Sequence, residues 1–98
     1  MNTSLTNYMA IIMSIIKKHA PQAKVMVFGS RARGDNDEGA DIDIALDEGI
    51  AIDRSKLSAI IGDLEESQLP ILFDVVDFRS VNERMQQEIL KEGIVWQK

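Results

Sequence analysis

The sequence contains no cysteine and only one histidine among its 98 residues. The absence of cysteine excludes disulfide bonds, thiolate catalysis and cysteine zinc sites, and it is typical of a protein from a reducing cytosol. A single histidine cannot build a multi-histidine metal site. Any bound metal must therefore have oxygen ligands, which indicates Mg²⁺, Mn²⁺ or Ca²⁺.

Positive charge and long apolar runs are also scarce. The 11 Lys and Arg residues against 16 Asp and Glu residues leave a formal net charge of −5. The chain therefore has no general positive field that would hold nucleic acid or an anionic membrane, which does not exclude one local phosphate site. The most apolar N-terminal stretch, residues 9–16, ends at Lys17, whereas a membrane helix needs about 20 residues. We expect a cytoplasmic protein.

The chain shows no repeat and no linker rich in Pro, Gly or Ser, so we expect one domain spanning residues 1–98. Apolar residues recur at helical spacing in some segments and form short β-rich runs in others. The helices are expected at 3–19, 53–66 and 81–91 and the strands at 24–28, 41–46 and 71–78, in the order α-β-β-α-β-α. Residues 94–96 are the candidate for one more short strand after the last helix. This order predicts an α/β (α+β) fold with a small mixed β-sheet flanked by helices.

Two helix starts carry capping signals. Asp53 is expected to cap the second helix. Residues 80–83 read Ser-Val-Asn-Glu, which matches a capping box at the start of the third helix. The residues of that helix expected to face the core are Met85, Ile89 and Leu90.

A pair of aspartates indicates a cation site. Asp41 and Asp43 stand two residues apart in an expected strand, so both carboxylates project from one face. Neighbouring carboxylates repel each other unless a cation lies between them. If the strand that contains Asp74 lies beside theirs, Asp74 completes a cluster that can bind one or two Mg²⁺ ions. Asp77 competes with Asp74 for this third position, and the odd spacing puts the two on opposite faces.

A glycine and a serine directly follow the strand at 24–28. Gly29 permits close backbone approach or an unusual φ, and Ser30 offers a hydroxyl and an N–H. If a helical turn starts here, its free N–H groups attract phosphate. Arg31 and Arg33 would add positive charge for a triphosphate, or they are surface charges that balance the acidic residues at 35–38.

These motifs in combination resemble a known superfamily. Gly29-Ser30, followed by Asp41-Ile42-Asp43 and then by an Asp in a hydrophobic strand, resembles the nucleotidyltransferases related to DNA polymerase β. The GSRARG…DIDI form in a chain of this length looks like the minimal nucleotidyltransferases (MNT), small proteins usually paired with a helical HEPN-type partner. Ala40 departs from the pattern, in which a serine often stands there, and this removes a hydrogen-bonding group but no metal ligand.

The resemblance implies a polymerase β-like fold and a Mg²⁺-dependent transfer of a nucleoside monophosphate, AMP if the donor is ATP, to an acceptor hydroxyl. In toxin–antitoxin pairs the acceptor can be a tyrosine of the HEPN toxin, and the MNT protein is the antitoxin. The resemblance also favours Asp74 over Asp77. The implied catalytic residues and metal ligands are Asp41, Asp43 and Asp74, and the implied phosphate-binding residues are Gly29 and Ser30, with Arg31 and Arg33 beside them.

Two other functions are compatible with the sequence. The chain could be a non-catalytic antitoxin that neutralises its partner by occlusion. It could also transfer a nucleotide to a small molecule, although relatives that modify antibiotics usually carry extra helical domains. Polymerisation of nucleic acid is disfavoured because the chain has a net charge of −5 and no recognisable duplex-binding domain.

Overall fold

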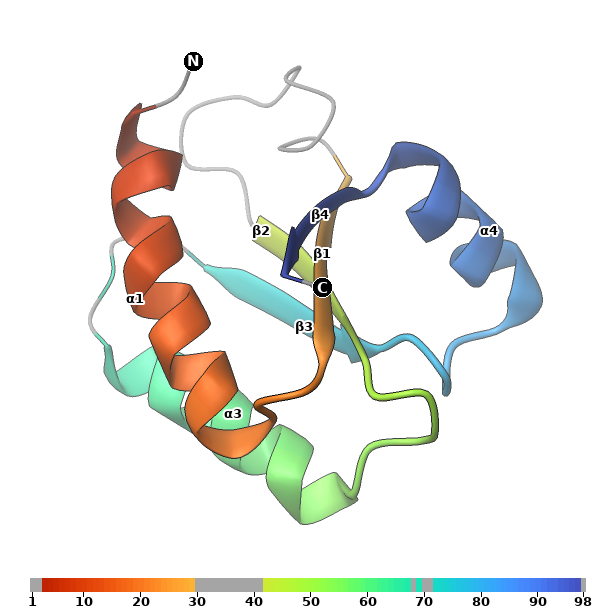
Figure 1. Ribbon diagram of the computed structural model, residues 1–98, viewed down its shortest axis with the longest axis horizontal. Helices are drawn as coiled ribbons and strands as arrows, with labels where there is room; N and C mark the ends of the chain where they lie inside the picture. The colour runs from red at the N-terminus through yellow and green to blue at the C-terminus, as the bar shows by residue number, and fades with distance from the viewer. Residues whose placement is uncertain (1–2, 30–41, 68, 70–71, 98) are drawn as a thin grey trace.

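The computed structural model describes residues 3–29, 42–67, 69 and 72–97. The elements occur in the expected order (Figure 1). They are α1 (Thr3–His19), β1 (Lys24–Phe28), β2 (Ile42–Asp47), α3 (Arg54–Glu66), β3 (Phe73–Asp77), α4 (Glu83–Glu92) and β4 (Ile94–Gln97). In the described ranges, no helix has the length and apolar character needed to cross a membrane.

The four strands form one mixed sheet in the order β3-β2-β1-β4. β1 is antiparallel to both β2 and β4, whereas β2 and β3 are parallel. A parallel pair needs a crossover connection, and α3 supplies it. The expected mixed sheet flanked by helices is confirmed, and β3 lies directly beside β2.

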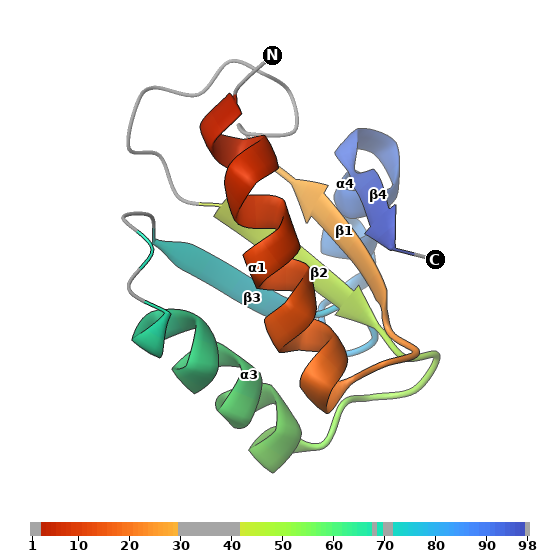
Figure 2. The same ribbon diagram turned by 60° about the vertical axis from the view of Figure 1, so that its left-hand side comes forward.

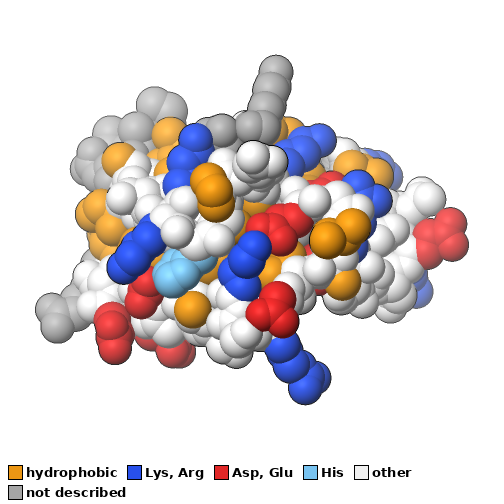
Figure 3. All heavy atoms as spheres, turned by 60° about the horizontal axis from the view of Figure 1, so that its bottom comes forward, with side chains coloured by type: hydrophobic (Ala, Val, Ile, Leu, Met, Phe, Trp, Pro, Cys, Tyr) orange, Lys and Arg blue, Asp and Glu red, His pale blue; other side chains and the backbone are white. Residues whose placement is uncertain are grey.

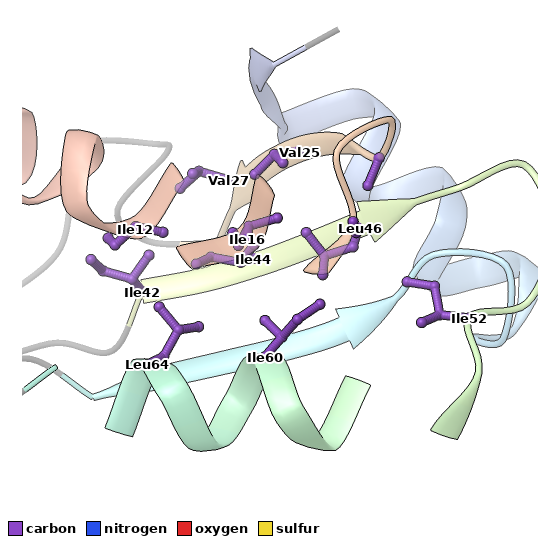
Figure 4. Packing of buried hydrophobic residues seen from close by; sticks show 12 residues of the cluster. Ile12, Ile16, Val25, Val27, Ile42, Ile44, Leu46, Ile52, Ile60 and Leu64 are labelled. Carbon is purple, nitrogen blue, oxygen red and sulfur yellow. The ribbon is translucent and has the colours of Figure 1, made fainter. Parts of the chain in front are cut away.

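The helices cover the two faces of the sheet unequally. α1 and α3 pack on one face, and α4 lies on the other (Figure 2). The larger core joins Ile12 and Ile16 of α1, the apolar side chains of β1 and β2, and Ile60 and Leu64 of α3, all pointing toward one another (Figure 4). The smaller core on the α4 face is formed by Met26, Ala45, Phe78 and Ile89.

The start and the inner face of α4 differ from the expectation. Asn82, not Ser80, is the N-cap: its side chain accepts a hydrogen bond from the Met85 N–H at 2.8 Å. Ser80 is unavailable because its hydroxyl donates to Asp77. Leu90 is 63% exposed, so the prediction that it faces the core is wrong. The face of α4 that contains Ile89 packs against the sheet, and Leu90, the next residue, points from another side of the helix into solvent.

The start of α3 also lacks the expected side-chain cap. Asp53 is the N-cap residue, but its side chain makes no hydrogen bond to the first turn of the backbone. Instead its carboxylate accepts a hydrogen bond from the Ser55 hydroxyl. The first turn is held by the main chain, where the Leu57 N–H donates to the Asp53 carbonyl at 3.0 Å.

An ion pair ties α1 to α3 on the surface. His19 Nε2 lies 2.6 Å from Asp63 Oδ2, and Lys18 Nζ lies 4.0 Å from the same oxygen. The hydrogen bond from His19 and the charges of His19 and Lys18 lower the pKa of Asp63, although partial burial acts in the opposite direction. In Figure 3 the histidine lies among interspersed basic and acidic side chains.

Asp63→Asn is expected to flatten the acid side of the pH–stability curve. A carboxyl whose pKa is lower in the folded state stabilises the fold above its unfolded pKa of about 3.9, and this contribution is lost as the pH falls toward the folded value. Urea unfolding at a series of acidic and neutral pH values measures the effect. His19→Gln removes the main cause and should flatten the curve similarly. An unchanged slope in both variants contradicts the expectation.

Candidate active site

Two of the three predicted metal ligands lie side by side. In the parallel register of β2 and β3, Asp43 is paired with Asp74. Paired residues of neighbouring strands project from the same face, and the strands are about 4.8 Å apart. Asp43 is half-buried and Asp74 is exposed. The structure therefore brings two carboxylates together at one end of the sheet, on the face opposite α1 and α3.

Gly29 lies against the Asp43 carboxylate. Its φ is +76°, in the region that L side chains rarely adopt. A Cβ at this position would collide with Asp43 Oδ2 and would come within 3.2 Å of Asp43 Cγ. Both properties that the sequence suggested for Gly29, an unusual φ and close approach, occur here. The main chain leaving β1 can pass the carboxylate only because no side chain intervenes.

Four of the predicted site residues lie outside the described part of the chain. They are Ser30, Arg31, Arg33 and Asp41. Their assignments stay predictions. Within residues 3–29, 42–67, 69 and 72–97, no group of three His, Cys, Asp or Glu residues could hold a metal. Asp43 and Asp74 need another donor to form a three-carboxylate cluster, and Asp41 is the residue predicted to supply it.

Asp77, the alternative to Asp74 as third ligand, is buried in a hydrogen-bonded environment. Its residue is only 5% exposed. Asp77 Oδ2 accepts hydrogen bonds from the Ile52 N–H at 2.8 Å and the Ser80 hydroxyl at 2.6 Å. Asp77 Oδ1 accepts one from the Arg79 N–H at 3.1 Å. The carboxylate ties the segment before α3 to the turn after β3, on the sheet face opposite Asp74.

Asp77→Ala is expected to lower the free energy of unfolding by about 2–4 kcal/mol, because buried donors lose their acceptor. Nucleotidyl transfer per folded molecule should change less than twofold. Denaturant unfolding and a transfer assay on the same preparations measure the two effects. Full stability with lost transfer would instead make Asp77 the third carboxylate of the site.

Phe28 is a neighbour of the site that the sequence interpretation did not identify. The antiparallel register pairs it with Asp43, so Phe28, Asp43 and Asp74 form one row across three strands. Phe28 is half-buried and packs against the smaller core. Its position immediately before Gly29 was the one feature of the sequence that could have identified Phe28. Which residue lies opposite Phe28 depends on the strand register, and spacing in the sequence does not determine the register.

Asp47 lies on the same sheet face as Asp43, at the opposite end of β2. Asp47 accepts hydrogen bonds from Arg79 Nε at 2.7 Å and Nη2 at 3.2 Å, and from the Gly49 N–H at 2.8 Å. Partial burial raises the pKa of Asp47, but these hydrogen bonds and the charges of Arg79 and Lys24 outweigh it and lower the pKa. Asp47 is thus a paired surface acid away from the candidate site.

The chain is similar to known proteins in both sequence and fold. Residues 11–96 match the family model described as polymerase beta, nucleotidyltransferase. The chain is 28% identical over 89 residues to a probable protein adenylyltransferase, MntA, of Haemophilus influenzae, which covers 91% of this chain and 78% of the relative.

Solved structures share the fold. A chain of a toxin–antitoxin crystal structure with AMP-PNP superposes with a TM-score of 0.78 at 24% identity, covering 92% of this chain and 73% of the other. A chain from the complex of a tri-AMPylated Shewanella oneidensis HEPN toxin with an MNT antitoxin gives a TM-score of 0.74 at 22% identity, covering 95% of this chain and 72% of the other. The family match extends over most of the sequence and includes Gly29, which directly follows β1, Asp43 in β2 and Asp74 in β3. The chain therefore belongs to the polymerase beta nucleotidyltransferase family.

Proposed function

We propose that this chain transfers AMP from Mg²⁺-bound ATP to a hydroxyl of a HEPN-type protein and acts as the antitoxin of that protein. The observation that carries the proposal is the placement of Asp43 and Asp74 in register, with Gly29 against the Asp43 carboxylate. The similarity to a probable protein adenylyltransferase supports AMP as the transferred group. The similarity to an MNT antitoxin in complex with an AMPylated HEPN toxin supports the partner.

The donor set fits one or two Mg²⁺ ions. Carboxylate oxygens are the ligands that Mg²⁺ prefers, and Asp43 and Asp74 place two carboxylates on one face of adjacent strands. Asp41, Asp43 and Asp74 would hold the metal. When bound, Mg²⁺ neutralises charge on the phosphate oxygens and lowers the pKa of the attacking hydroxyl.

The remaining steps need few side chains, because phosphoryl chemistry depends mainly on position and charge. Gly29 keeps the strand end clear of side-chain atoms, so that its backbone and Ser30 would hold the phosphates of ATP, with Arg31 and Arg33 beside them. The acceptor oxygen forms a bond to the α-phosphorus, and the bond to the β-phosphate bridge oxygen breaks as pyrophosphate leaves with the electron pair. Asp74, which is exposed, would take the proton of the acceptor hydroxyl.

A label-transfer experiment tests the proposal. The chain is mixed with a candidate HEPN-type partner protein, Mg²⁺ and ATP labelled at the α-phosphate. Label should appear on the HEPN-type protein and should disappear when EDTA removes the metal. ATP labelled at the γ-phosphate is the matched control, and it should leave both proteins unlabelled. A stable, neutralising complex without label would establish occlusion in place of transfer, and label on a small molecule would identify a different acceptor.

A further inference from the structure

β3 has a backbone edge that no other described strand covers. The sheet order places β3 outermost, next to β2 only. The Ile42 N–H donates to the Leu72 carbonyl, and the Phe78 N–H donates to the Leu46 carbonyl, both at 2.9 Å. Hydrogen-bonding groups alternate along a strand, so the even-numbered residues of β3 face β2. The N–H and C=O groups of Phe73 and Val75 therefore point away from the sheet.

An apolar groove follows this edge on the α3 side. Its volume is about 230 Å³, and α3, β3 and the segment between them line it. Phe73 and Val75 contribute side chains from β3, and Leu72 at the start of the strand is 69% exposed. Natural edge strands are protected by charged side chains, Pro, a bulge or short length. Residues 73–77 contain no Pro, and their pairing with β2 shows no bulge. Their two charged residues leave the outer backbone open, because Asp77 is buried against the Ile52 N–H and Asp74 projects from the sheet face beside Asp43.

The groove and the candidate active site share this one strand. Phe73 and Val75 project toward α3, whereas Asp74 projects from the other face beside Asp43. An added strand would follow the same alternation. A residue placed opposite Asp74 would point toward the carboxylates, and its two neighbours would point into the groove. In an antiparallel arrangement this residue and Asp74 would form a non-hydrogen-bonded pair, in which side chains are closest.

Charge complementarity indicates the kind of segment that fits. Glu65 is the charged residue among those lining the groove, and it is exposed, as is Glu66 beside it. Asp74 adds a third acid on the other face of the edge, and the whole chain carries a net charge of −5. An acidic rim around an apolar groove complements a segment that is apolar near its centre and basic at its ends.

We propose that the outer edge of β3 binds an extended segment of the acceptor protein as an added strand. The segment presents its hydroxyl residue opposite Asp74, buries the apolar residues on either side in the groove, and places basic residues near Glu65 and Glu66. This inference rests on the proposed transfer to a protein hydroxyl. It explains how a chain of 98 residues could position an acceptor beside its carboxylates.

Hydrogen exchange tests the docking without relying on catalysis. Amide exchange is measured in the chain alone and in its complex with the HEPN-type protein. The Phe73 and Val75 amides should become protected, because the added strand would bond to them. Unchanged exchange at both amides in a formed complex overturns the proposal, and so does the absence of any complex. Protection without label transfer would leave the docking standing and would reject the proposed function instead.

Substitutions in the groove provide a second readout. Leu72→Glu should raise the KM for the HEPN-type protein about tenfold or more, with nucleotide affinity unchanged, because it adds negative charge to the apolar surface. Val75→Pro removes an N–H that points away from β2 and would bond to the added strand, so it should also raise the KM for the HEPN-type protein. Leu90→Glu is the matched control, because Leu90 is a similarly exposed leucine on α4, and it should change the KM less than twofold. Folded Leu72→Glu and Val75→Pro proteins with unaltered transfer overturn the proposal.

Discussion

Asp43→Asn is expected to reduce AMP transfer by roughly a thousandfold. A catalytic metal contributes several kcal/mol of charge stabilisation in the transition state, and about 4 kcal/mol corresponds to this factor. The neutral amide keeps the shape of the side chain, so the free energy of unfolding should fall by no more than about 1 kcal/mol. Transfer of label from ATP, measured beside urea unfolding, gives both quantities. Asp74→Asn should have a similar effect, since the two carboxylates lie in register.

Asp47→Asn is the matched control for Asp43→Asn. Asp47 belongs to the same strand and projects from the same face, but it lies at the other end, hydrogen-bonded to Arg79. Asp47→Asn should retain transfer and lose some stability through the weakened Arg79 pair. Normal turnover by a folded Asp43→Asn protein would reject Asp43 as a metal ligand. Equal losses in the two variants would show that any charge change on this strand impairs transfer.

Gly29→Ala is expected to reduce transfer about a hundredfold, because a misplacement near 1 Å at a reacting centre has an effect of this size. The new Cβ would overlap Asp43 Oδ2, so the carboxylate must move. The substitution should also destabilise the fold, since an alanine at a φ of +76° carries a strain of about 1–2 kcal/mol. Transfer kinetics, metal affinity and denaturant unfolding report the effects separately.

Gly49→Ala separates backbone strain from the contact with Asp43. Gly49 has a φ of +85°, close to that of Gly29, but a Cβ there would meet no atom within 4 Å. Gly49→Ala should therefore show a comparable strain penalty with normal transfer. If Gly29→Ala transfers AMP as well as Gly49→Ala does, the close approach of Gly29 to the carboxylate has no role in the reaction.

Much of the fold could be predicted because local patterns decide it. The helical spacing of Ile12 and Ile16, with three basic or titratable residues in the last turn and Pro21 beyond, placed α1 correctly. The alternation around Asp43 placed β2 and separated its apolar side chains from its acids. Where two local signals overlapped, the prediction was wrong: Ser80 and Asn82 both resemble caps, and the buried Asp77 carboxylate decides the outcome by engaging Ser80.

The residue types of the candidate site and their spacing could be predicted from the sequence, but most of its geometry could not. The period-two alternation determined that Asp74 and Asp77 lie on opposite faces. It did not determine that Asp77 would be buried and hydrogen-bonded to the Ile52 N–H. That environment arises from a segment 25 residues earlier in the chain, and no local rule anticipates such a contact.

Composition limits any metal ligands to oxygen donors, and short-range periodicity predicts the order of the elements, because both are properties of the linear chain. The family was inferred separately, from the resemblance of the motifs around Gly29 and Asp43. Only the tertiary structure decided that Asp43 lies beside Asp74, that Gly29 contacts the Asp43 carboxylate, and that β3 is the outer strand. These facts depend on strand register and order. Register is set by the packing of α1 and α3 against one face of the sheet, since a shift of one residue would turn the apolar side chains of β2 away from them.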